Sequence, residues 1–216
     1  DACEQAGIPR IPDFNTGDNE GVSYFQVNQK DGLRWNTAKA FLRPAMNRPN
    51  LTLWTHTQTE KLLFDGQRAS ALRVHRRDGA AQTVAARREI ILSAGSIGSP
   101  QILELSGVGQ GELLAERGIE TLHALPGVGE NLSDHLQVRA AFRVSGVSTL
   151  NTRIKSRGGR AAMALDFALR RRGPLTRSPS QLGVFCKSDP SRETANLQYH
   201  VQSKTEKTLL IKIIWL

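Results

Sequence analysis

The chain has 216 residues, 39% of them hydrophobic and 23% charged, which is ordinary for a globular protein of one or two domains. No apolar stretch reaches the length of a membrane span and the N-terminus has no signal-peptide pattern, so neither a transmembrane nor a secreted protein is indicated. The 29 Lys and Arg exceed the 20 Asp and Glu, but they are scattered and lack interleaved aromatic residues. We therefore interpret them as solvated surface and rank a nucleic-acid-binding module far behind.

The first third of the chain predicts an irregular segment, a helix and then an antiparallel meander. Residues 1–30 are rich in Gly, Asp, Asn and Pro with one alternating run at 22–29, and residues 37–46 have helical spacing with Thr37 as the expected cap. Asp65-Gly66 and Asp78-Gly79 separate the extended runs that follow, and such dipeptides favour tight hairpin turns. The extended runs lie at 51–59, 61–64, 69–75 and 82–85.

Residues 88–109, REIILSAGSIGSPQILELSGVG, carry the most specific pattern in the chain. The apolar run predicts a strand over 90–93 that is buried on both faces of a parallel sheet. Ser99 is the expected N-cap of the next helix, with Pro100 at its first position and Gly107 beyond its end. Small residues at such a turn let a ligand approach the backbone, and a helix N-terminus favours negative charge, so a nucleotide site is indicated.

The rest of the chain predicts short helices and strands. The last segment, 204–216, is apolar and β-prone; we interpret it as a frameshifted or artificial end, with a genuine divergent strand as the alternative. Helices are expected over 111–117 and 161–171, and strands over 119–122, 136–144, 182–186 and 196–202.

Several of these segments together resemble one enzyme family. GSIGSPQILELSGVG resembles the second signature of the glucose-methanol-choline (GMC) oxidoreductases, and the likeness runs in order from residue 1 to 203. Because chains of that family are much longer, we expect a central fragment of a choline-dehydrogenase-like member. The other matching segments are DFN at 13–15, EGV at 20–22, YFQV at 24–27, RWNTAKAFLRPAMNR at 34–48, PGVGENLSDH at 126–135, RRGPL at 171–175 and LQYH at 197–200.

The resemblance implies a mixed α/β (α+β) fold class. It predicts a partial FAD-binding, Rossmann-like domain with an antiparallel meander over residues 31–140. It also predicts part of an antiparallel-sheet substrate-binding domain from residues 1–30 and 141–203, with 204–216 as a tail outside the family.

FAD is the cofactor that the resemblance implies. Thr59 stands where the family usually has Val, whose main-chain N–H and C=O pair with the adenine edge; an ordinary strand Thr is the alternative. Ala94, Gly95 and Ser99 are expected beside the dinucleotide, although such small residues also occur simply to permit tight strand–helix packing.

No catalytic or metal-binding residue is predicted. His56, His75 and His123 lack an acidic or nucleophilic partner at motif spacing, and His135 falls in a structural block. His200 lies in a substrate-domain strand that could approach the pocket. The family's catalytic His lies near the C-terminus of its longer chains, so no residue here inherits that role. Cys3 and Cys186 match no metal spacing and are expected as reduced, buried thiols rather than as one disulfide.

The expected function of the parent protein is FAD-dependent hydride transfer from a primary alcohol, choline-like or other, to the flavin. Its expected partners are the alcohol and an electron acceptor (oxygen, a quinone or a dye), without nucleic acid or a transmembrane segment. The expected location is cytoplasmic or membrane-peripheral. The chain by itself is expected to be inactive, and a truncated fragment without any ligand is the alternative.

Overall fold

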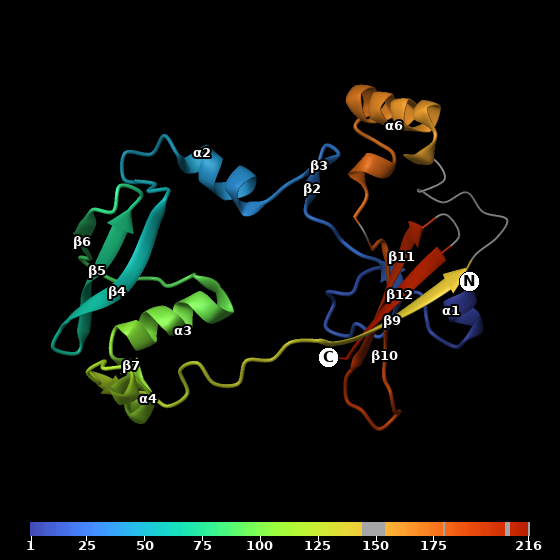
Figure 1. The fold of residues 1–216 in the computed structure, drawn as a ribbon. Helices are drawn as coiled ribbons and strands as arrows, with labels where there is room; N and C mark the ends of the chain where they lie inside the picture. The colour runs from blue at the N-terminus through green and yellow to red at the C-terminus, as the bar shows by residue number, and fades with distance from the viewer. Residues whose placement is uncertain (144–153, 179, 206–207, 216) are drawn as a thin grey trace. The chain divides into compact units, whose positions relative to one another are not determined.

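The computed structural model describes residues 1–143, 154–178, 180–205 and 208–215, which form two compact units (Figure 1). The first unit comprises Asp1–Asn47 and His135–Leu216, and the second comprises Arg48–Asp134. These boundaries differ from the predicted domain limits at 30/31 and 140/141, because 31–47 and 135–140 cluster with the first unit. Two separate parts of the chain build the first unit.

The first unit is organised around a five-stranded sheet in the order β1-β10-β11-β12-β9, in which every neighbouring pair is antiparallel. Val22 and Val184 lie opposite each other on one face and are both buried. On the other face the ring of Phe14 lies 4.8 Å from that of Phe185. The strands are β1 (Gly21–Tyr24), β9 (Leu136–Arg143), β10 (Leu182–Cys186), β11 (Leu197–Thr205) and β12 (Thr208–Trp215).

The described part of residues 204–216 belongs to the sheet. β12 pairs with β11 on one side and β9 on the other, and Ile214 is only 5% exposed. The β-prone composition suits this central position. The interpretation of the segment as an artificial end, with a genuine divergent strand as the alternative, concerns its origin and stays a prediction.

Short elements accompany this sheet. The helix expected over 37–46 is a π-helical turn, η1 (Ala38–Leu42), continued by α2 (Arg43–Ala45). Thr37 stands at the N-cap position but its side chain makes no capping hydrogen bond, and the Asn36 side chain instead accepts the Lys39 N–H at 3.0 Å. The remaining elements are α1 (Ala2–Gln5), β2 (Gln29–Lys30), β3 (Leu33–Arg34), α6 (Arg157–Arg170) and η2 (Pro174–Thr176).

The second unit begins with the expected meander. β4 (Thr57–Asp65), β5 (Arg68–Arg76) and β6 (Ala81–Ala85) pair antiparallel, and Gly66 and Gly79 take positive φ in the turns between them. The α3 helix (Gly95–Leu105), β7 (Val108–Gly109), α4 (Gly111–Glu116) and β8 (His123–Ala124) follow. The apolar core consists of Leu62, Ala71, Val74, Ile102, Val108 and Leu114.

The prediction of a buried parallel strand over 90–93 is wrong for this structure. These residues have no regular secondary structure, and Ile91 is 78% exposed. A strand is stabilised by backbone hydrogen bonds to a neighbour, and no described strand pairs with this segment. In the described part of the chain, β7 and β8 are the one parallel pair of strands, and an isolated parallel bridge joins Arg10 to Val22.

Candidate functional site

The turn into α3 holds three of the four predicted cofactor residues. The helix begins at Gly95, not after Ser99, so Ser99 and Pro100 lie inside it. Ser99 does not act as the N-cap; instead its Oγ accepts the Ala94 N–H at 3.0 Å and fixes the turn that precedes the helix. The physical reason is Gly95, whose φ of +85° reverses the chain so that the helix begins five residues before Pro100, the first position that the Ser-Pro pair indicated.

This helix N-terminus is open. Ala94, Gly95, Ser96 and Ile97 are all exposed, and a Cβ built on Gly95 meets no atom within 4 Å. The first turn contains no acidic residue. The first N–H groups of a helix have no intrahelical acceptor and carry partial positive charge, so this end of α3 suits an anionic ligand.

Thr59 lies on the outer strand of the meander. It pairs with Val74 of β5, and a β-bulge follows it, because Glu60 and Lys61 together lie opposite Arg73. The Thr59 carbonyl accepts a hydrogen bond from the Gln58 side-chain amide at 3.3 Å, so a donor outside the sheet ladder reaches it. Since β4 is an edge strand of its sheet, backbone groups on its outer side are available to a ligand.

A buried serine joins β4 to α3. The Ser106 Oγ accepts the Leu62 N–H at 2.8 Å and donates to the Ile102 carbonyl. This bond attaches the C-terminal end of α3 to the middle of β4. Thr59 and the 94–99 turn therefore belong to the same unit, although within the described residues no hydrogen bond connects them directly.

The fold gives His75 an acidic partner that does not stand at motif spacing in the sequence. His75 Nε2 lies 2.6 Å from Glu60 Oε2, and Arg73 Nε lies 3.1 Å from the same oxygen. The hydrogen bond with His75, followed by the charge of Arg73, lowers the pKa of the Glu60 carboxyl. This cluster is an ion-pair network on the outer face of the meander.

The first unit contains a pocket of about 430 Å³ that the sequence analysis did not assign. It lies between the segment from β1 to β3 and the segment that follows α6. Two hydrogen bonds join these segments: Phe25 N–H to the Gln181 carbonyl (2.8 Å) and Gln29 Nε2 to the Thr176 carbonyl (2.6 Å). The sequence offered one indication of this pocket, namely that both segments that form it, YFQV and RRGPL, resemble the family. The lining residues are Tyr24, Phe25, Val27, Gln29, Gly32, Arg171, Arg172, Gly173, Thr176, Arg177, Ser178 and Gln181.

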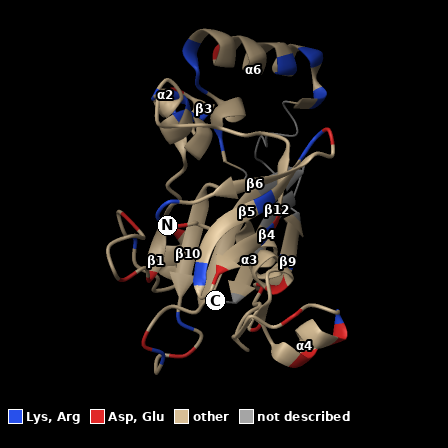
Figure 2. Ribbon diagram, turned by 90° about the vertical axis from the view of Figure 1, so that its left-hand side faces the viewer, with Lys and Arg blue, Asp and Glu red and all other residues tan. Residues whose placement is uncertain are grey.

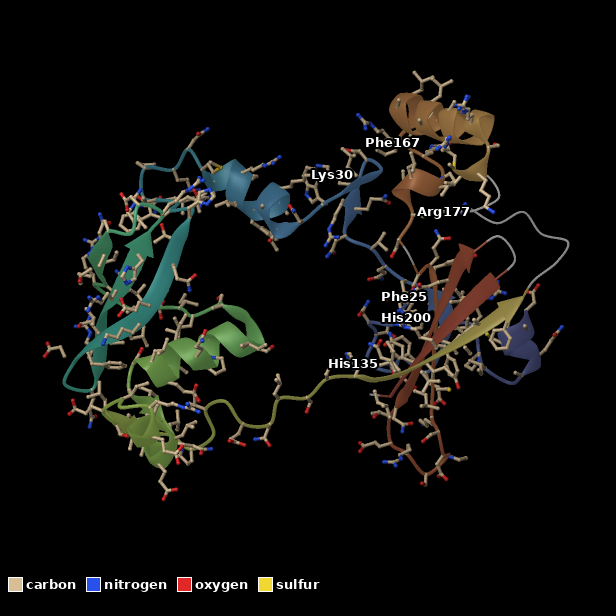
Figure 3. All side chains as sticks on the ribbon, viewed as in Figure 1. Phe25, Lys30, His135, Phe167, Arg177 and His200 are labelled. Atoms are coloured by element: carbon tan, nitrogen blue, oxygen red, sulfur yellow. The ribbon has the colours of Figure 1, made fainter. Side chains whose placement is uncertain are left out.

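His200 lies next to this pocket through Phe25. The two rings are 4.7 Å apart, and Figure 3 shows them together on the sheet, with Arg177 on the segment between the sheet and α6. Gly183 makes the arrangement possible, because a Cβ at this position of β10 would collide with the Phe25 ring. The Phe25 ring therefore lines the pocket and has His200 on the sheet as its neighbour.

The other predicted features are located as follows. Cys3 and Cys186 are free and half-buried, and burial raises the pKa of the Cys186 thiol. Figure 2 shows Lys and Arg spread over several elements of both units. In the part of the chain that the structure describes, no group of His, Cys, Asp and Glu is arranged to hold a metal ion, and no helix has the length and apolarity to span a bilayer.

Comparison with known proteins identifies the family. Residues 1–137 match the model of the family described as GMC oxidoreductase. The chain belongs to the GMC oxidoreductases. This GMC chain is 36% identical over 197 residues to an alcohol dehydrogenase [acceptor] of Pseudomonas putida, covering 91% of the chain and 36% of that protein. It is 37% identical over 202 residues to an oxygen-dependent choline dehydrogenase of Photobacterium profundum, covering 93% of the chain and 35% of that protein.

Solved structures show the same fold. A formate oxidase of Aspergillus oryzae superimposes with a TM-score of 0.87 at 21% identity, covering 99% of this GMC chain and 43% of that one. An FAD-dependent oxidoreductase from Chaetomium thermophilum gives a TM-score of 0.86 at 22% identity, covering 98% and 45%. The chain spans about a third of the length of its curated relatives.

Proposed function

We propose that this chain is part of an FAD-dependent oxidoreductase that transfers hydride from a primary alcohol to the flavin. The observation that carries the proposal is the family match over 1–137, together with relatives named as alcohol and choline dehydrogenases. When bound, the flavin supplies the hydride acceptor, which no amino-acid side chain can replace.

The residues at the start of α3 fit such a cofactor. We propose that the exposed Ala94–Gly95 backbone lies beside the dinucleotide, where the helix N-terminus favours its negative charge. Ser99 contributes by holding the Ala94 N–H, which fixes the turn that the ligand approaches. Thr59 contributes its main chain to the adenine edge, since the recognition needs backbone groups and β4 leaves one edge open.

We propose different roles for the two parts of the fold. Residues 31–140 belong to the FAD-binding domain, and residues 1–30 and 141–203 belong to the substrate-binding domain. The substrate is a small alcohol, and oxygen, a quinone or a dye takes the electrons from the reduced flavin. We place the enzyme in the cytoplasm or at the membrane periphery.

Flavin content and its response to alcohol test this proposal. The complete protein is purified, its visible flavin absorbance is recorded, and primary alcohols including choline are added without oxygen. We expect flavin bands that bleach with at least one alcohol and recover when an electron acceptor is added. A protein that binds no flavin, or whose flavin remains oxidised with every alcohol, would refute the proposal.

A further inference from the structure

The charged residues that line the pocket of the first unit are all basic. Arg171, Arg172 and Arg177 line it, and none of its lining residues is Asp or Glu. The acidic residue of α6, Asp166, lies next to the lining residue Gly173, where a Cβ would come 2.6 Å from Asp166 Oδ2, and it forms an ion pair with Arg170 at 3.7 Å. The uncharged polar lining comes from Gln29, Thr176, Ser178 and Gln181.

The arginine-bearing segment is held in place from several directions. Arg171 takes a left-handed conformation at the end of α6, with its guanidinium 5.1 Å from the centre of the Phe167 ring. Gly32 packs directly against the Arg171 carbonyl, where any Cβ would collide. Thr176 Oγ1 donates to the Gly173 carbonyl at 2.8 Å and closes the next turn. These contacts hold the backbone of the segment that carries the arginines, and a binding site requires its residues to be held in place in this way.

We propose that this pocket binds an anionic group, a carboxylate or a phosphate, carried by a small molecule. Arginine guanidinium groups donate paired hydrogen bonds to both kinds of anion. Arg172 and Arg177, with no carboxylate among the lining residues, repel a quaternary ammonium such as choline, whereas the Arg171 guanidinium lies over the Phe167 ring. Because Phe25 lines the pocket and also stacks on His200, a bound anion lies beside the face of the sheet that carries this histidine.

The identity of the ligand rests on the proposed function. If the protein oxidises alcohols, the molecule held here is the substrate, and the substrate class is an alcohol that also carries a carboxylate or phosphate. The anion binding itself requires neither flavin nor turnover, so it is measured independently of the proposed function.

Titration of the 216-residue chain at constant ionic strength tests the proposal. The probes are inorganic phosphate, glycolate and choline, and the variants are Arg177→Gln, Arg172→Gln and, as the matched control, Arg192→Gln. Arg192 is an exposed arginine of the same unit outside the pocket lining, so it loses the same charge at a different place. Circular dichroism verifies that all variants retain the wild-type fold.

We expect phosphate, glycolate or both to bind and choline not to bind. Each pocket variant should weaken anion binding by about tenfold, the size of one charge-assisted hydrogen bond, whereas Arg192→Gln should not change it. Binding of glycolate assigns a carboxylate, and binding of phosphate alone assigns a phosphate. The proposal is overturned if neither anion binds, if the pocket variants bind like Arg192→Gln, or if choline binds as tightly as the anions. Displacement of the bound anion by FAD would overturn its assignment to the substrate.

Discussion

The Glu60 carboxylate acquires two partners that are distant in sequence. His75 is fifteen residues away, and the two meet because β4 and β5 pair with Glu60 on the face that carries Arg73 and His75. A hairpin with a bulge has a register that composition alone does not define. For this reason a histidine without a partner at motif spacing still has one in the fold.

Replacing Glu60 should change how stability depends on pH. The pKa of the Glu60 carboxyl is lowered in the folded state, so its ionised form stabilises the fold at neutral pH. This contribution is present above the pKa of an unfolded glutamate and is lost as pH falls below about 4, through the lowered folded value. Glu60→Gln should therefore lower the melting temperature at pH 7, and the difference from wild type should shrink towards pH 3.

Thermal melts across this pH range provide the measurement. Glu89→Gln, at an exposed position of the same unit, is the control and should show a much smaller difference at every pH. A Glu60→Gln deficit that stays constant down to pH 3 would show that the His75–Glu60–Arg73 network does not stabilise the fold through its charge.

Gly95 is the residue at which the cofactor proposal is most directly testable. Gly95→Val places a branched side chain where we propose close approach of the dinucleotide. Gly79→Val is a matched control, because Gly79 has a φ of +81° against +85° for Gly95, and a Cβ at either position meets no atom within 4 Å. Both variants therefore carry similar backbone strain.

In the complete protein we expect the flavin-to-protein absorbance ratio to fall severalfold in Gly95→Val and to stay near wild type in Gly79→Val. Equal losses in the two variants would attribute the effect to strain alone and remove the support for Gly95 as a cofactor contact.

At the scale of elements, the hydroxyl of one buried serine connects the backbone of β4 to α3. Ser106 is 5% exposed and bonds both the Leu62 N–H and the Ile102 carbonyl. Ser106→Ala leaves a buried backbone N–H without its acceptor, which costs about 1–3 kcal/mol of the free energy of unfolding. Ser96→Ala, at an exposed position of the same helix, should change that free energy by less than about 0.5 kcal/mol.

Urea unfolding of both variants, followed by circular dichroism, measures the difference. A Ser106→Ala variant as stable as Ser96→Ala would mean that the hydroxyl is not what attaches α3 to β4.

The elements that sequence predicted well are those whose causes are local. The β4–β5–β6 meander follows from alternating side chains and from glycines at 66 and 79 that take positive φ in the turns. The conformation of residues 90–93 could not be predicted from local sequence features, because a buried strand depends on partner strands elsewhere in the chain. The start of α3 was misplaced by five residues, from Pro100 to Gly95, because Gly95 rather than the Ser99-Pro100 pair reverses the backbone.

The candidate site also contains residues that the sequence indicated locally and a pocket that depends on contacts between distant segments. Ala94, Gly95 and Ser99 came from a recognisable motif and Thr59 from a position that the resemblance aligns with a family Val, and the structure gives the surroundings of all four. The arginine pocket could not be predicted, since its two sides lie more than 140 residues apart and meet through the Gln29–Thr176 bond. Motif matching located both segments without showing that they form one cavity.

At the scale of the whole chain, the sheet of the first unit joins residues from both ends of the sequence. β1, near the N-terminus, pairs with β10, and β9 is attached to the rest of the sheet only through β12. Such pairing between distant segments makes this sheet sensitive to the loss of any central strand.

Removing β12 is the most direct test of its place in the fold. Deletion of residues 206–216 would leave β9 without a neighbour and expose the edge of β11, since β12 pairs with both. Open edges of this kind lose hydrogen-exchange protection and promote association. We expect the amides of β9 and β11 to exchange much faster and the truncated chain to associate, while β4 and β5 of the other unit keep their protection.

A point variant separates the loss of the strand from the loss of chain length. Ile214 is 5% exposed, so Ile214→Asp buries an unpaired carboxylate in the same strand, and Ile97→Asp, at a residue 73% exposed, is its control. Ile214→Asp should reproduce the faster exchange in β9 and β11, and Ile97→Asp should leave it unchanged. If the deletion and Ile214→Asp both retain wild-type protection in β9 and β11, the segment is a dispensable tail and its interpretation as a central strand fails.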